Sequence, residues 1–66
     1  MENSFQIWES NDGIGWKFYA ESDVSFHAIR TARNESHGRY LRVDNAELNK
    51  TLIVFRDGMA LRTTDA

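Results

Sequence analysis

Serines and histidines in the middle of the chain are the residues whose types could support nucleophilic or acid–base chemistry. The candidates are Ser22, Ser25, Ser36, His27 and His37. None lies in a motif that activates a nucleophile, because the sequence has no Gly-x-Ser-x-Gly turn, no glycine-rich phosphate loop and no His-Glu-x-x-His pair. We interpret both histidines as solvated surface residues and Ser36 as part of a helix terminus.

Carboxylates are dispersed in small groups, and each group has a structural explanation. Acids near a helix N-terminus are stabilised by its partial positive charge, and Asp in turns binds local backbone amides. The groups are Glu9 with Asp12, Glu21 with Asp23, and Asp44 with Glu47. Residues 11–13 are too few for a calcium loop, and the lack of cysteine excludes disulfides and thiolate metal sites. We therefore predict a protein that is not an enzyme and uses no metal or cofactor.

Arginine is concentrated between residues 27 and 42. This segment holds four arginines and one acid, a charge of +3, which leaves −5 on the rest of a chain whose net charge is −2. Arginine presents a rigid donor fork to carboxylates and phosphates. We predict that one side of the molecule carries the partner-binding residues Arg30, Arg33, Arg39 and Arg42. The alternative interpretation is a solvated helix face whose cations lie favourably near a helix C-terminus.

The chain also has more aromatic residues than one face of a small sheet can bury. Alternation within residues 4–9 and 16–20 predicts that one face, turned to the core, carries Phe5, Ile7, Trp16 and Phe18. The opposite face then carries Trp8, Lys17 and Tyr19, and Tyr40 joins it from a later strand. Since Trp and Tyr are enriched in binding hot spots, we predict partner contacts at these three rings and at Lys17 on the same face. The alternative is a sheet that curls around the helix and absorbs most of the rings.

Residues 51–62, TLIVFRDGMALR, predict a β-hairpin that we expect to contain the central strand. Asp57-Gly58 is a strong two-residue turn signal, because this turn needs positive φ, which Gly supplies freely and Asp tolerates. The apolar run 52–55 predicts a strand covered on both faces.

The remaining segments predict a second hairpin, one helix and one further strand. Strands 4–9 and 16–20 flank a polar turn at 10–13, and the helix runs from Asp23 to about Ser36 with Ser22 or Asp23 as its cap. Gly38 suits a left-handed residue after the helix. A strand at 39–44 is followed by a polar loop at 45–50, where Leu48 is a candidate to fold back onto the core, and 63–66 is expected to fray.

These elements predict a single α+β domain over residues 1–66, a two-layer sandwich with one helix on one face of an antiparallel sheet of about five strands, in the order ββαβββ. The sequence does not fix the strand order. No apolar run is long enough for a bilayer, so we expect a soluble, cytoplasmic protein without membrane contact. A chain this short buries limited surface, which favours burial against another protein or a second copy, as in a homodimer.

The leading functional hypothesis is a small non-enzymatic protein-binding regulator or inhibitor that acts through an exposed aromatic and arginine surface. By size and style it fits the proteins carried by phages and mobile elements, including inhibitors of bacterial defence systems. The alternative is a nucleic-acid-binding module with Trp8, Tyr19 and Tyr40 as stacking platforms and Lys17, Arg39 and Arg42 on phosphates. An acidic pI of about 5.5 counts against nucleic acid.

Overall fold

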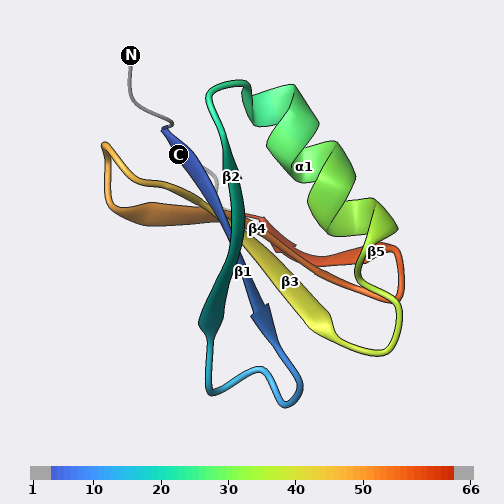
Figure 1. Ribbon diagram of the computed structural model, residues 1–66. Coiled ribbons are helices and arrows are strands. Elements are labelled where there is room, and N and C mark those ends of the chain that lie inside the picture. The colour runs from blue at the N-terminus through green and yellow to red at the C-terminus, as the bar shows by residue number, and fades with distance from the viewer. Residues whose placement is uncertain (1–3, 64–66) are drawn as a thin grey trace.

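One helix packs on one face of a five-stranded antiparallel sheet in the computed structural model, which describes residues 4–63 (Figure 1). The elements, in chain order, are β1 (Phe5–Ser10), β2 (Lys17–Ser22), α1 (Ser25–Asn34), β3 (Tyr40–Asn45), β4 (Lys50–Arg56) and β5 (Met59–Thr63). The predicted α+β sandwich with the order ββαβββ is confirmed. The end of the expected frayed tail, 64–66, lies outside the described residues. Within residues 4–63, no helix has the length and apolar character needed to cross a membrane.

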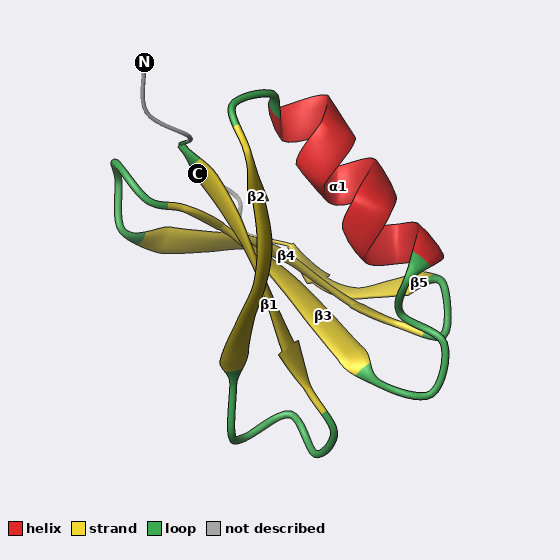
Figure 2. Ribbon diagram, viewed as in Figure 1, coloured by secondary structure: helices red, strands yellow, loops and turns green. Residues whose placement is uncertain are grey.

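The strands lie in the order β2-β1-β3-β4-β5, and every neighbouring pair is antiparallel (Figure 2). After β2 the chain passes over one face of the sheet as α1, and it returns as β3 on the other side of β1. Because β2 and β3 both run antiparallel to β1, they are parallel to each other. The central strand is therefore β3. The expectation that 52–55 forms the central strand was wrong, because these residues belong to β4, the fourth of the five strands in the sheet.

The core forms where the middle of the sheet meets α1. Its buried side chains are Ile7, Leu41, Val43 and Phe55 from the sheet and Ala28 and Ala32 from the helix. The strand register pairs Leu41 with Phe55 and Val43 with both Ile7 and Ile53, which places the large side chains on one face. The two alanines let the helix approach this face closely, so the strands supply the bulk of the core.

Bulges interrupt three of the four strand pairings, and each inserts one extra residue into one strand. The extra residues are Tyr19 in β2, Leu52 in β4 and Leu61 in β5. A bulge sets two residues against one on the partner strand, which bends the strand and increases its twist. Tyr19 and Ala20 are consecutive, yet both pack against the core on the helix side.

The bulge at Tyr19 overturns the predicted faces of residues 16–20. Without it, Phe18 would lie opposite Glu9 and face the helix, but the observed register pairs Phe18 with Trp8. Phe18 is therefore on the opposite face and is 49% exposed. Tyr19, predicted to face away from the helix, lies on the helix side, and Trp16, predicted to be in the core, lies before β2 and contacts Arg42 on the opposite face.

Both predicted hairpin turns are present. Asp57 and Gly58 have φ values of 53° and 80°, the left-handed geometry of a two-residue hairpin, and Arg56 pairs with Met59 across it. In the turn between β1 and β2, the Ser10 hydroxyl accepts a hydrogen bond from the Gly13 amide at 2.8 Å. The Asp12 carboxylate accepts hydrogen bonds from the amides of the two residues that follow Gly13.

The ends of α1 and one loop differ from the predictions. The N-cap is Val24, with no side-chain cap, because the Ser22 hydroxyl bonds to the amide and carbonyl of Val24 instead. The expected cap at Ser22 or Asp23 was therefore wrong. Gly38 is left-handed, as predicted, with φ 74°. Leu48 is 65% exposed and does not fold back onto the core.

Candidate functional site

The sheet surface opposite α1, called the far face here, gathers aromatic and arginine side chains from all five strands and the turn before β2. Strand register and ring contacts place together Trp8, Trp16, Phe18, Tyr40, Arg42, Val54, Arg56 and Leu61. Among the described residues α1 is the only helix, and it covers the opposite face of the sheet, so no helix shields the far face.

Arg42 lies between the two tryptophans of the far face. Its guanidinium carbon is 5.5 Å from the Trp8 ring centroid and 4.7 Å from that of Trp16. The guanidinium also donates two hydrogen bonds to Asp44, at 2.9 and 3.0 Å. This bidentate pair neutralises the charge of Arg42 and fixes its plane, so the side chain acts as a flat support for the indole rings.

Trp8 is held by its ring contacts rather than by a hydrogen bond. It meets Phe18 edge to face, with ring centroids 5.6 Å apart and an interplanar angle of 85°. Its indole nitrogen is buried and has no hydrogen-bond acceptor among residues 4–63. The indole therefore keeps its position through packing between Phe18 and Arg42.

A second arginine and aromatic pair borders a shallow groove on the same face. The Arg56 guanidinium carbon lies 4.6 Å from the Tyr40 ring centroid, and its Nε is 3.4 Å from an Asp57 oxygen. The groove has a volume of about 290 Å³ and is lined by Gly13, Trp16, Tyr40, Val54 and Leu61. A Cβ at Gly13 would lie 3.4 Å from the Tyr40 ring, so glycine at this position avoids a close contact with the ring.

Large apolar side chains on the far face and in the turns beside it remain open to solvent. Phe18 is 49% exposed and Leu61 56%, while Met59 and Ile14, at the two hairpin turns, reach 68% and 82%. Clustered exposed apolar side chains of this kind mark interaction sites more often than single ones do. The far face thus combines neutralised arginines, partly covered rings and an apolar rim.

The predicted arginine side does not form one surface. Arg42 lies on the far face and Arg30 and Arg33 lie on α1, whereas Arg39 joins β1, β2 and the end of the helix. Arg39 pairs with Glu9 at 2.6 Å, donates to the Glu35 carbonyl at 2.9 Å and stacks on the Tyr19 ring at 4.9 Å.

Of the predicted aromatic contacts, Trp8 and Tyr40 lie on the far face. Tyr19 belongs to the Arg39 network, where its hydroxyl donates to the Glu35 carboxylate at 3.2 Å. Lys17 is exposed and lies opposite Glu9 in β1, so it is on the helix side of the sheet and not on the face of Trp8, where it was predicted. Partner contact at all these residues stays a prediction.

Sequence reasoning missed four members of the far face, Trp16, Phe18, Arg56 and Leu61, and left the face of Val54 open. Phe18 and Leu61 depend on bulges, which leave no glycine or proline signal in these strands. Arg56 was detectable in principle, because a strand alternating from Val54 places both residues on one face.

The serines and histidines in the middle of the chain have structural or surface positions. The buried Ser36 hydroxyl donates to the Arg33 carbonyl at 2.8 Å and accepts from the Gly58 amide at 2.7 Å. Both histidines are exposed. Within residues 4–63 no three His, Cys, Asp or Glu side chains come together as metal ligands.

Two turn carboxylates have altered acidity for reasons of local geometry. The amides of Gly15 and Ile14 donate to Asp12 and lower its pKa below the usual value. The Gly38 amide, and then the nearby Arg56 guanidinium, lower the pKa of Asp57 in the same direction. Both carboxylates stabilise turns next to the far face.

The far face is the largest gathering of aromatic side chains on the described part of the chain. Comparisons with protein-family models, curated proteins and solved structures found no match to this chain.

Proposed function

We propose that this domain is a non-enzymatic protein-binding regulator or inhibitor whose far face docks on an apolar surface of another protein. The observation that carries the proposal is that Leu61, which lines the groove of about 290 Å³, and Phe18, which lies beside Trp8 on the same face, are both half-exposed. An apolar side chain of the partner would enter the groove, and the rings of Trp16 and Tyr40 would supply contact area with few rotatable bonds.

The pairing of the cations supports a protein partner over nucleic acid. Arg42 is bonded to Asp44, Arg56 lies against Asp57 and Arg39 is bonded to Glu9. Phosphate binding draws its free energy from cations that neutralise phosphates, and these guanidinium groups are already paired on a chain whose net charge is −2. A neutral apolar surface instead matches the core of a protein interface, where charged residues are depleted.

Two phenylalanines provide a matched test. Phe18 lies on the far face and is 49% exposed, whereas Phe26 lies on α1 and is 63% exposed. Immobilised wild-type domain, Phe18→Ala and Phe26→Ala are used to capture proteins from the native cell extract. We expect the partner to be retained by the wild type and Phe26→Ala and to bind Phe18→Ala about tenfold more weakly, because hot-spot truncation costs more than about 1 kcal/mol.

The purified partner should then change the tryptophan emission of the domain, because Trp8 and Trp16 both lie on the far face. Equal retention by all three proteins, or binding without a change in emission, would contradict the proposal. Sedimentation of the domain alone reveals whether a second copy is the occupant. Binding that collapses as salt rises from low to moderate concentration would assign the face to nucleic acid instead.

A further inference from the structure

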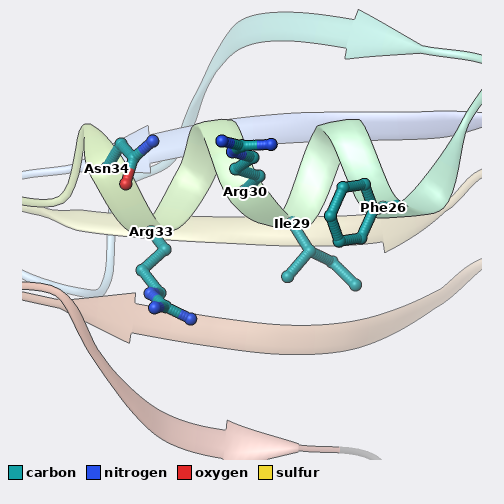
Figure 3. Close-up of a pocket in the computed structure, with 5 residues that line it drawn as sticks. All are labelled: Phe26, Ile29, Arg30, Arg33 and Asn34. Carbon is teal, nitrogen blue, oxygen red and sulfur yellow. The ribbon is translucent and has the colours of Figure 1, made fainter.

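The outward side of α1 carries a second shallow groove, called the helix groove here. Its volume is about 360 Å³, and it is lined by Phe26, Ile29, Arg30, Arg33 and Asn34 (Figure 3). Residues four apart on a helix are neighbours, so Phe26 lies beside Arg30 and Ile29 beside Arg33. Figure 3 shows Ile29 and Arg33 extending from the same side of the helix. The groove therefore combines apolar side chains with two cations.

The two arginines of the helix groove differ from the three arginines that form ion pairs in the described part of the chain. Arg39, Arg42 and Arg56 each pair with a carboxylate, whereas neither Arg30 nor Arg33 has an ion-pair partner among the described residues. Arg30 instead lies over the Phe26 ring, 5.9 Å from its centroid. Both guanidinium groups thus retain donors for a ligand.

The charge of α1 also contrasts with that of the rest of the molecule. Residues 25–34 contain two arginines and no acid, a charge of +2, so a net charge of −2 for the chain leaves −4 elsewhere. The helix groove is a cationic patch on an otherwise acidic protein. Such a patch steers an anionic ligand toward α1 and away from the remaining surface.

We propose that the helix groove binds an acidic amphipathic helix of a protein partner. Arg30 and Arg33 are three residues apart, so their Cβ atoms are about 5–6 Å from each other, the spacing of carboxylates one turn apart on a partner helix. Each guanidinium can hold a carboxylate with two hydrogen bonds. Apolar side chains on the same face of the partner would contact Phe26 and Ile29.

A helical protein segment fits the groove better than a nucleic acid does. The lining residues Phe26–Asn34 rise about 12 Å along α1, which matches two turns of a partner helix. Two cations neutralise few phosphates, and the −4 on the remaining chain repels an extended polyanion. The exposed Phe26 and the partly buried Ile29 add an apolar contact that a phosphate backbone would leave unused.

The probe is a fluorescein-labelled synthetic amphipathic helix of about 20 residues with Glu and Leu on one face, a length at which isolated helices form. Fluorescence anisotropy at low salt measures its affinity for the wild type, Arg30→Glu and Lys17→Glu. Lys17 is exposed on β2, so both variants change the charge equally. We expect Arg30→Glu to weaken binding about tenfold or more and Lys17→Glu by less than about twofold.

Further measurements decide where the probe lies. Binding in the helix groove should leave the emission of Trp8 and Trp16 unchanged, because both lie on the far face. Phe26→Ala should weaken binding of the probe, whereas Phe18→Ala should leave its affinity unchanged. This difference separates the helix-groove proposal from the far-face proposal. Circular dichroism confirms that each variant is folded.

Any of four results would overturn the proposal. These are no saturable binding, equal affinity of Arg30→Glu and wild type, a change in tryptophan emission on adding the probe, and equal affinity for the same peptide with Gln in place of Glu. A single-stranded oligonucleotide that binds more tightly, with the same dependence on Arg30, would replace the acidic helix with nucleic acid as the occupant.

Discussion

The far face and the helix groove use arginine in opposite ways. On the far face, Arg42 is bonded to Asp44 and lies between two indoles, so its charge is neutralised and its plane is covered by rings. In the helix groove, Arg30 and Arg33 have no carboxylate partner among the described residues, so their charge and donors remain available. Arginines that form one cluster in the sequence are thereby divided between an apolar surface and a cationic one.

The two surfaces share the core that separates them, and this limits which substitutions can test one surface alone. Leu41 and Val43 are fully buried in β3, the strand whose other face carries Tyr40 and Arg42. A change in the core would disturb both surfaces, whereas a change at Phe18 or Phe26 alters one of them.

The largest expected effect comes from truncating Leu41 in the core. Leu41→Ala should lower the free energy of unfolding by about 2–5 kcal/mol, because it removes a buried side chain and leaves a cavity. Phe18→Ala, on the far face of the same sheet, should cost about 1 kcal/mol, the value of its edge contact with Trp8. Urea unfolding followed by circular dichroism measures both. If Phe18→Ala is as destabilising as Leu41→Ala, the far face is part of the core and not a docking surface.

The elements of this fold follow from the sequence because their signals are local. Alternating apolar residues in β1 and β3, Asp57-Gly58 between two apolar runs, and the small residues Ala28 and Ala32 on one side of α1 each indicate an element without reference to the others. The two-layer arrangement then follows from the need to bury one face of the sheet.

The faces of individual residues could not be predicted where a bulge intervenes. The alternation of residues 16–20 is the same with or without a bulge at Tyr19, yet the bulge moves Phe18 from the core to the far face. The extra residue of this bulge is Tyr19, and no glycine or proline in residues 16–20 marks its position in the sequence. The position of β1 between β2 and β3 also depends on long-range pairing rather than on a local pattern.

A smaller loss is expected at Ser36, which ties the loop after α1 to the hairpin turn between β4 and β5. Ser36→Ala leaves the Gly58 amide without its acceptor in a part-buried position, so the free energy of unfolding should fall by about 1–3 kcal/mol. Ser25→Ala is the matched control, since Ser25 is exposed and Val24 is the N-cap. Thermal unfolding compares the two variants. An equal loss in both would show that the hydrogen bond to Gly58 contributes little.

The smallest expected effect is a pH dependence of stability that comes from Asp57, whose carboxylate contacts Gly38 after α1 and Arg56 in β4. Its carboxylate accepts a hydrogen bond from the Gly38 amide at 2.8 Å and lies 3.4 Å from Nε of Arg56. These contacts lower the pKa of Asp57 in the folded state. A depressed folded-state pKa contributes stability above the unfolded value of about 3.9, and this contribution is lost as the pH falls through the folded value.

Asp57→Asn isolates this effect, because Asn tolerates the left-handed φ of 53° at this position while losing the charge. Wild type should be more stable than the variant at neutral pH, and the difference should shrink below about pH 4 as the carboxylate becomes protonated. Urea midpoints measured across this range give the comparison. A difference that grows on acidification would mean that the charge of Asp57 opposes folding. Binding at the helix groove should be the same in both proteins, since Asp57 contacts Arg56 and Gly38 and does not line that groove.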